Sequence, residues 1–222
     1  NLDYFDYMRG LEMVNDRFAR LFGGPRRFPE SRVTRREMDL AASIQAFTEE
    51  AVLAMARHVR KETGEKYLCL AGGVALNCVA NGKLYRDKLF DEIWIQPSAG
   101  DAGSALGAAL AVQFGHHRVA RPPKQALDRQ KGSYLGPRFS EREVEAYLVA
   151  KGCAYRKLDM AERGDTVAEA LAQGAVVGLF NGRMEFGPRS LGARSILGDP
   201  RREDTQRTMN LRIKYRESFR PF

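Results

Sequence analysis

Lys66-Tyr-Leu-Cys-Leu-Ala-Gly-Gly-Val-Ala-Leu-Asn77 decides the fold class of this 222-residue chain. Its first six residues form an apolar run with the length and flanks of a strand, and Gly72-Gly73 then turns the chain into a helix predicted over 74–86. A second strand is predicted at 92–96, and a helix of small residues at 101–112. Short strands that alternate with helices predict a layered α/β domain.

Further elements are predicted on both sides of this core. Upstream, apolar residues at helical spacing predict amphipathic helices at 3–22 and at about 38–62. Downstream, Ser140 followed by Glu143 forms a capping-box pattern that predicts a helix over 141–151. The remaining predictions are a helix at 166–173, a strand at 175–181 and a helix at 201–210.

Composition limits the functional class. The chain carries a net charge of +8, but its basic residues gather in glycine-containing loops rather than along a helix, so nucleic acid is not the expected partner. No apolar run is long enough to span a bilayer, and no signal peptide opens the chain. An odd number of cysteines without metal-ligand spacing predicts reduced core thiols and a cytoplasmic location: Cys69, Cys78 and Cys153.

A second motif, Asn181-Gly-Arg-Met-Glu-Phe-Gly-Pro-Arg-Ser-Leu-Gly-Ala-Arg-Ser-Ile-Leu197, combines three arginines with three glycines and one carboxylate. It is too rich in glycine for a helix and too charged for a buried strand, so we predict a loop. Guanidinium groups match phosphate oxygens in a bidentate way, and glycines let the backbone approach a ligand closely. Apolar residues interleave with the charges and predict partial burial, and Glu185 alone cannot neutralise all the arginines. The motif therefore predicts an anion pocket, which a second basic cluster near the end of the sequence would extend: Arg183, Arg189, Arg194, Lys214, Arg216 and Arg220.

Two smaller patterns allow a structural and a functional interpretation. Ala71–Asn77 lies where a strand meets a helix, so its glycines could form a tight packing turn or could admit phosphate and ribose oxygens to a helix N-terminus. Asp101 stands in the first turn of a helix, where the chemistry favours an N-cap over a metal or hydroxyl contact.

Together these motifs resemble the O-carbamoyltransferases of nodulation-factor and antibiotic biosynthesis. The residues that carry the resemblance are Ala71–Asn77, Gly100–Gly107, Gly182–Ile196 and Lys214–Phe222, so it extends over essentially the whole chain.

The resemblance implies two fused α/β domains. The first, at 1–118, would be the C-terminal half of an actin-like (ASKHA-type) domain that binds metal and nucleotide and transfers the carbamoyl group. A linker at 119–132 would lead to the N-terminal part, at 133–222, of a domain like threonylcarbamoyl-AMP synthase (YrdC-like). That domain would make carbamoyl-adenylate from ATP and carbamoyl phosphate, and the first would pass the carbamoyl group to a hydroxyl of a small-molecule or sugar acceptor.

The resemblance also assigns residues. It implies nucleotide contacts for Gly72, Gly73, Val74 and Asn77, and a metal ligand role for Asp101, with Fe²⁺ or a similar divalent ion whose other ligands lie outside this chain. Arg189, Lys214 and Arg220 are implied to be the catalytic contacts of carbamoyl phosphate. Arg183, Arg194 and Arg216 would be supporting cations.

The family's histidine metal ligands and the rest of the second domain are not found in these 222 residues, so we expect the isolated chain to be inactive. Two alternatives stay open: a threonylcarbamoyl-type tRNA-modification enzyme, and a non-catalytic module that binds anions or nucleotides. The acceptor, the metal and the oligomeric state do not follow from the sequence.

Overall fold

The computed structural model describes residues 2–121 and 128–222. The chain forms two compact units: residues 1–47 with 206–222 make unit 1, and residues 48–205 make unit 2. The boundary at residue 48 falls inside the long helix α2 (Arg35–Thr63). Of the predicted linker 119–132, residues 122–127 lie outside the described part of the chain.

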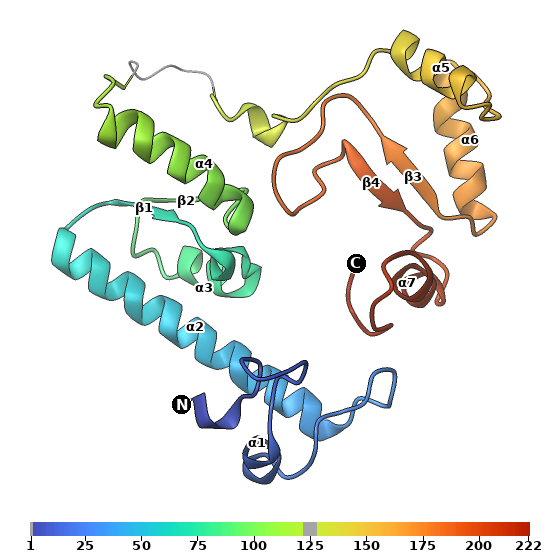
Figure 1. The fold of residues 1–222 in the computed structure, drawn as a ribbon. Helices are drawn as coiled ribbons and strands as arrows, with labels where there is room; N and C mark the ends of the chain where they lie inside the picture. The colour runs from blue at the N-terminus through green and yellow to red at the C-terminus, as the bar shows by residue number, and fades with distance from the viewer. Residues whose placement is uncertain (1, 122–127) are drawn as a thin grey trace. The chain divides into compact units, whose positions relative to one another are not determined.

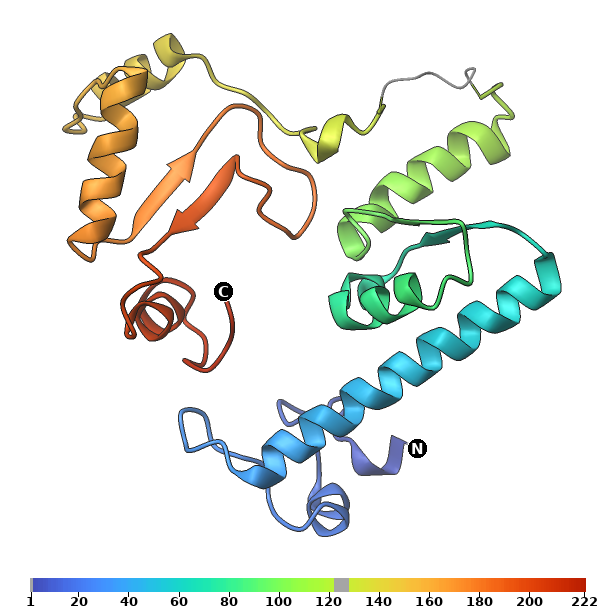
Figure 2. The same cartoon turned by 180° about the vertical axis from the view of Figure 1, so that it is seen from behind.

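The first part of unit 2 has the predicted order of strand, turn, helix and strand. Strand β1 (Tyr67–Leu70) pairs in parallel with β2 (Glu92–Ile95), and the chain between them forms the 3₁₀ turn η2 (Gly73–Leu76) and α3 (Cys78–Arg86). The predicted single helix over 74–86 is therefore divided at Asn77. In both views α2 and α3 lie on one side of the strand pair and α4 (Asp101–Ala111) on the other (Figures 1 and 2). This arrangement confirms a mixed α/β architecture.

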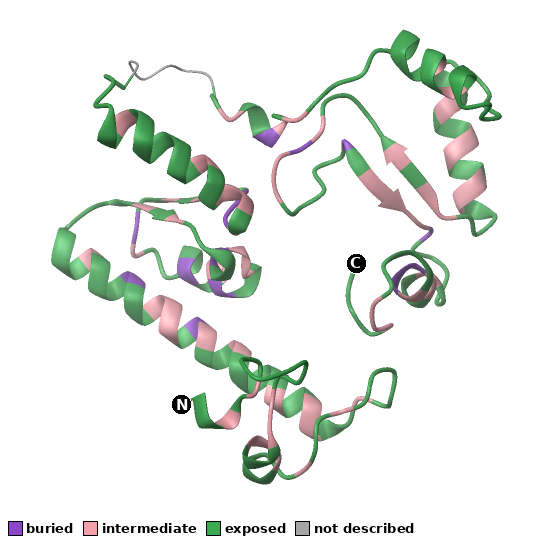
Figure 3. Cartoon of the chain, viewed as in Figure 1, coloured by how far each residue is buried: buried purple, intermediate pink, exposed green. Residues whose placement is uncertain are grey.

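The core of this region lies on the face of the strand pair that α2 and α3 cover. Ala56 of α2, Leu84 of α3 and Phe90 are buried, and Leu68, Leu70 and Ile93 of the strands pack against them together with neighbouring leucines and a valine. Among the described residues few are buried, as the purple segments in Figure 3 show. The other face of β1 and β2 is exposed at Tyr67 and Trp94.

The second part of unit 2 contains an antiparallel strand pair. The capping box of Ser140 and Glu143 begins α5 (Glu141–Ala150) as predicted. Helix α6 (Met160–Ala172) begins earlier than predicted, because Asp159 and Glu162 form a second capping box. Strand β3 (Val177–Phe180) then pairs with β4 (Arg194–Leu197), and this pairing corrects the prediction that 181–197 is entirely loop.

Unit 1 departs most from the predicted elements. Instead of one helix over 3–22 it has the 3₁₀ turn η1 (Leu2–Tyr4), an antiparallel bridge between Phe5 and Val14, and the short α1 (Asp16–Leu21). The single helix is wrong because the side chain of Asn15 accepts N–H bonds from Arg17 and Phe18 and so begins a new helix there.

The C-terminal elements are shorter than the predicted helix at 201–210. Helix α7 (Thr205–Thr208) passes into the π-helical turn η5 (Met209–Ile213). A similar π turn, η3 (Val112–His116), extends α4, and the 3₁₀ turn η4 (Lys131–Ser133) precedes α5.

The three cysteines are free, but the prediction that they are core thiols is wrong. All three are exposed, because Cys69 lies on the face of β1 opposite the core and the other two lie at a helix start and in a loop. Within residues 2–121 and 128–222 no helix is long and apolar enough to cross a membrane.

Candidate functional site

The loops after the two parallel strands meet at the carboxyl-terminal end of the sheet, which is the edge referred to below. The backbone N–H of Gly72, directly beyond β1, donates to the carbonyl of Ala99, beyond β2, at 2.8 Å. Gly72 has φ of 97°, a conformation that favours glycine. In open α/β sheets, ligands bind outside the carboxyl ends of the strands, so this edge is where a site is expected.

The predicted nucleotide-binding residues lie at this edge, and they differ in whether they are exposed or are used within the fold. Gly72, Gly73 and Val74 are exposed, and a Cβ added to Gly73 would meet no atom within 4 Å, which leaves room for a ligand. Asn77 instead caps α3, because its Oδ1 accepts the N–H of Ala80 at 3.1 Å. Asn77 therefore has a structural role as a helix cap, and the backbone of Gly72–Val74 remains accessible to a ligand.

Asp101 is exposed in the first turn of α4, at the same edge. The prediction that it is an N-cap is wrong, because Gly100 occupies the cap position and no side chain caps this helix. Its carboxylate suits a hard cation, yet no group of three or more His, Cys, Asp or Glu side chains gathers around a common point in the described residues. One carboxylate supplies one ligand, so the residues present do not make a metal site by themselves.

The predicted anion-binding stretch 181–197, called the glycine-arginine motif below, is hydrogen-bonded to the turn after β2. Ser98 is fully buried, and its hydroxyl donates to the carbonyl of Phe186 at 2.7 Å. Gly187 has φ of 125°, and a Cβ at that position would lie 2.6 Å from the Ser98 hydroxyl oxygen. Ser98 was not among the predicted site residues, although its place in a Pro-Ser-Ala-Gly turn after a strand was the available signal.

Glu185 is the centre of the motif. Its side chain has no exposed surface, and one carboxylate oxygen accepts the backbone N–H groups of Leu191 at 2.9 Å, Ala193 at 2.7 Å and Arg194 at 3.1 Å. Burial by itself raises the pKa of this carboxyl, but the backbone N–H donors outweigh burial and lower the pKa to about 2. Glu185 is therefore an anion at neutral pH that orders its own loop.

Two of the three arginines in the motif are used within the fold. The Arg194 Nε lies 3.1 Å from the second oxygen of Glu185, and its Nη2 donates to the Glu185 carbonyl at 2.8 Å. Arg183 donates to the carbonyl of Gly136 at 2.7 Å. The sequence argument that these cations require external anions therefore fails for Arg194, which Glu185 neutralises.

The second basic cluster has its own centre in unit 1. Asn210 is fully buried, and its amide donates to the carbonyls of Ser218 at 3.1 Å and Arg220 at 2.6 Å. The Arg216 Nε donates to the side-chain oxygen Oδ1 of Asn210 at 2.6 Å, and its guanidinium stacks over the Phe222 ring at 4.9 Å. Arg216 is thus part of the scaffold, and Asn210 is a second residue that the sequence analysis missed.

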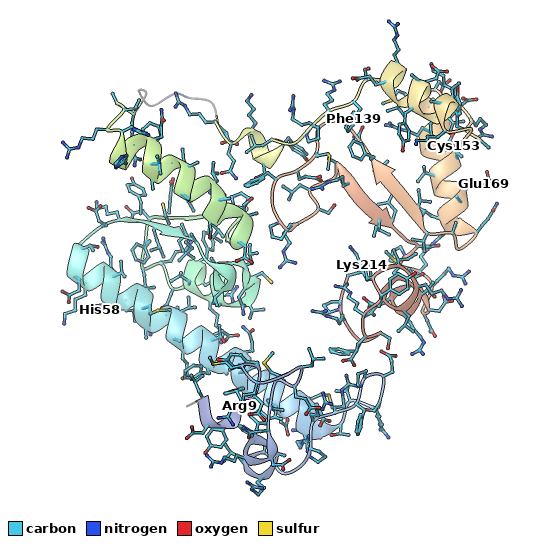
Figure 4. All side chains as sticks on the ribbon, viewed as in Figure 1. Arg9, His58, Phe139, Cys153, Glu169 and Lys214 are labelled. Carbon is cyan, nitrogen blue, oxygen red and sulfur yellow. The ribbon has the colours of Figure 1, made fainter. Side chains whose placement is uncertain are left out.

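Three of the six predicted cations remain available to a ligand. Across the described residues, the side chains of Arg189, Lys214 and Arg220 are exposed and have no hydrogen-bond, ion-pair or ring partner. Arg189 lies in unit 2, and Lys214 and Arg220 lie in unit 1, where Figure 4 labels Lys214 at the end of η5. Free cations on ordered backbones can bind phosphate oxygens. These three are also the residues to which the sequence analysis gave the primary contacts.

Comparison with known proteins covers both ends of the chain. Residues 1–110 match the family model "Carbamoyltransferase N-terminus", and residues 168–222 match "Carbamoyltransferase C-terminus". An uncharacterized protein of Synechocystis sp. is 56% identical over 100% of this chain and 36% of its own length. Nodulation protein NolO of Bradyrhizobium diazoefficiens is 45% identical over 85% of this chain and 34% of its own length. Nodulation protein NolNO of Sinorhizobium fredii is 44% identical over 85% of this chain and 27% of its own length, so the chain spans about a third of these curated relatives.

Proposed function

The chain belongs to the carbamoyltransferase family, and we propose that it is part of an ATP-dependent O-carbamoyltransferase. In the proposed reaction, water releases carbamate and phosphate from carbamoyl phosphate. A carbamate oxygen then attacks the α-phosphorus of ATP, and pyrophosphate leaves as carbamoyl-adenylate forms. Finally an acceptor hydroxyl attacks the carbamoyl carbon, loses its proton, and AMP leaves.

The observation that carries the proposal is the division of the six cations. Arg183, Arg194 and Arg216 are occupied by carbonyl, carboxylate and amide oxygens of the protein. Arg189, Lys214 and Arg220 have no such partner among the described residues. Charge on the phosphoryl oxygens grows and shifts as carbamate attacks ATP, and fixed cations stabilise that charge. We assign the three free cations to carbamoyl phosphate and to the phosphates of ATP.

The edge of the β1–β2 sheet is proposed to bind nucleotide. Gly72, Gly73 and Val74 offer an exposed backbone for phosphate or ribose oxygens, and the family resemblance supports an actin-like domain here and a YrdC-like domain for 133–222. For a divalent ion such as Fe²⁺, Asp101 would supply one oxygen ligand, and the other ligands would come from outside this chain. The acceptor is proposed to be a hydroxyl-bearing small molecule or sugar.

A pyrophosphate-release assay on the complete natural polypeptide tests the reaction. We expect release that requires both ATP and carbamoyl phosphate and that rises with a suitable hydroxyl acceptor from a panel of sugars and small alcohols. The isolated 222 residues are expected to transfer no carbamoyl group. Release without carbamoyl phosphate would contradict the proposal, and a requirement for tRNA as acceptor would favour a tRNA-modifying enzyme.

Calorimetric titration with carbamoyl phosphate tests the cations directly. Arg189→Ala should weaken binding about tenfold or more, because a charge-assisted hydrogen bond to phosphate is worth about 1.5–3 kcal/mol. Arg142→Ala is the matched control, since Arg142 is an exposed cation on α5 outside the proposed site. Equal affinity for wild type and Arg189→Ala would remove Arg189 from the site.

A further inference from the structure

The segment Lys214–Arg220 is held by a loop from the other end of unit 1. Glu30 is its main contact: one carboxylate oxygen accepts the backbone N–H of Ser218 at 2.8 Å, and the other accepts the Ser218 hydroxyl at 2.8 Å. Arg207 also lies 3.6 Å from Glu30. A single glutamate therefore fixes both the backbone and the side chain of Ser218.

Arg27 holds the same segment from the other side of this loop. Its guanidinium pairs with Glu217 and lies over the Phe219 ring at 5.5 Å. The same guanidinium donates to the carbonyl of Ser31 at 2.6 Å, so the loop and the segment are tied through one side chain that is only 15% exposed. We call the contacts of Arg27 and Glu30 with residues 217–219 the Glu30 clamp.

Backbone conformation supports a specialised role for the Glu30 clamp. Glu30 has φ of 59° and Tyr215 has φ of 49°, both in the left-handed region that non-glycine residues seldom adopt. Such conformations persist where surrounding contacts fix them, and they often occur at binding sites. The N–H of Glu30 itself donates to Glu217 at 3.4 Å, so the unusual backbone is part of the clamp.

We propose that Glu30 and Arg27 are positioning residues that hold Lys214 and Arg220 in place for a phosphorylated ligand. The Glu30 clamp binds the residues between these two cations and leaves both cationic groups free, which is the arrangement that an ordered anion site needs. Glu30 lies in the part that matches the carbamoyltransferase N-terminus, and Ser218 lies in the part that matches the C-terminus. The N-terminal family domain thus completes a binding element of the C-terminal one. This inference rests on the proposed phosphate-binding role of Lys214 and Arg220.

The test is a double-mutant cycle on Glu30 and Ser218 in the complete natural polypeptide, with carbamoyl phosphate affinity as the readout. Glu30→Ala should weaken binding by roughly tenfold, the size of effect that supporting residues have at binding sites. Ser218→Ala should weaken it less, and should add nothing in the Glu30→Ala background because Glu30 is the one partner of the Ser218 hydroxyl among the described residues. Glu30→Gln should restore most of the affinity, since an amide can accept from the Ser218 N–H and donate to its hydroxyl.

Arg27→Ala should also weaken binding, because Arg27 pairs with Glu217. Arg26→Ala is its matched control: Arg26 lies in the same loop but pairs with Glu12, so its loss should leave the affinity unchanged. Amide exchange separates positioning from global destabilisation: in Glu30→Ala the Ser218 amide should exchange faster, while helix α1 keeps its protection.

The outcomes distinguish the two proposals. If wild type fails to bind carbamoyl phosphate, or Lys214→Ala binds as tightly as wild type, the proposed function is at fault. If Lys214→Ala weakens binding and Glu30→Ala does not, or if Glu30→Gln behaves like Glu30→Ala, the positioning inference alone is overturned.

Discussion

Two regions that carry predicted anion-binding cations, the glycine-arginine motif at 181–197 and the basic segment at 214–220, are held in place by different contacts. In the motif, Glu185 accepts N–H groups only six, eight and nine residues further along the chain. In the segment, Ser218 is held by Glu30, 188 residues away, in addition to the local support from Asn210. The motif is organised mainly by its own buried carboxylate, and the segment depends on the closure of unit 1 around it.

This difference has a thermodynamic consequence. A buried carboxylate with several N–H donors cannot be removed without leaving those donors unsatisfied, so the motif should be insensitive to salt and very sensitive to substitution. Partly exposed ion pairs contribute little and are screened by salt. The segment should therefore respond to solution conditions that leave the motif unchanged.

The largest effect is expected from Glu185→Ala. It leaves three backbone N–H groups and the Nε of Arg194 without their acceptor, so the melting temperature should fall by about 5–10 °C. Glu203→Ala, at an exposed position of the same unit, should shift it by about 1 °C or less. Equal thermal stability of the two variants by differential scanning fluorimetry would contradict the central role of Glu185.

Gly187→Ala should have the next largest effect. The added Cβ would lie 2.6 Å from the Ser98 hydroxyl oxygen at a φ of 125°, and we expect a cost of about 1–3 kcal/mol in unfolding free energy by urea denaturation. Gly178→Ala is the control, because that Cβ would meet no atom within 4 Å and the φ of Gly178 is not in the left-handed region. A Gly187→Ala protein as stable as Gly178→Ala would mean that the motif does not need its contact with Ser98.

Acid should destabilise the motif in a defined range. The pKa of Glu185 falls from an ordinary 4.5 to about 2 in the folded chain, so its stabilising contribution is present above pH 4.5 and is lost as the pH falls from 4.5 to 2. Asp199 behaves alike, because side-chain and backbone hydrogen bonds from Arg201 lower its pKa to about 2. Melting temperatures measured from pH 6 to pH 3 should fall more steeply for wild type than for Glu185→Gln; parallel curves would argue against this assignment.

Salt should produce the smallest effect, and only in the segment. At 1 M salt the screening length is about 3 Å. Amide exchange at 214–220 should then become about two- to fivefold faster, because the pairs of Glu217 with Arg27 and of Glu30 with Arg207 are partly exposed. Amide exchange at 182–197, measured by mass spectrometry in the same samples, should not change with salt. Faster exchange at 182–197 but not at 214–220 would contradict the difference between the two regions.

Local patterns predicted much of the fold. The capping box of Ser140 and Glu143, the strand-turn-helix order from residue 66 and the long helix α2 all have signals within a few residues of sequence, and the structure confirms them. The prediction failed where a longer apolar pattern was interrupted, as at Asn15 in the supposed helix over 3–22. Spacing alone does not reveal that a polar side chain will cap a new helix in the middle of an amphipathic pattern.

The residue types of the candidate site could be predicted from the sequence, but not which cations bond within the protein and which remain free for a ligand. The sequence identified six cations but not which of them meet an oxygen of the protein: Arg194 and Arg216 find partners nine and six residues away, whereas other contacts join distant parts of the chain. Arg183 finds the carbonyl of Gly136, 47 residues away, and Ser98 reaches Phe186 across 88 residues. Neither contact has a local signature.

By itself, then, the sequence determined the family, the α/β order of elements and the residues able to bind an anion. These properties follow from residue type, periodicity and caps, which act over a turn of helix or a strand. Only the tertiary structure decided which cations are part of the scaffold and which remain free, and that Glu30 supports the segment that bears Lys214 and Arg220. The contact of Arg183 with Gly136 and that of Glu30 with Ser218 form only after the chain has closed long loops, so no local pattern specifies them.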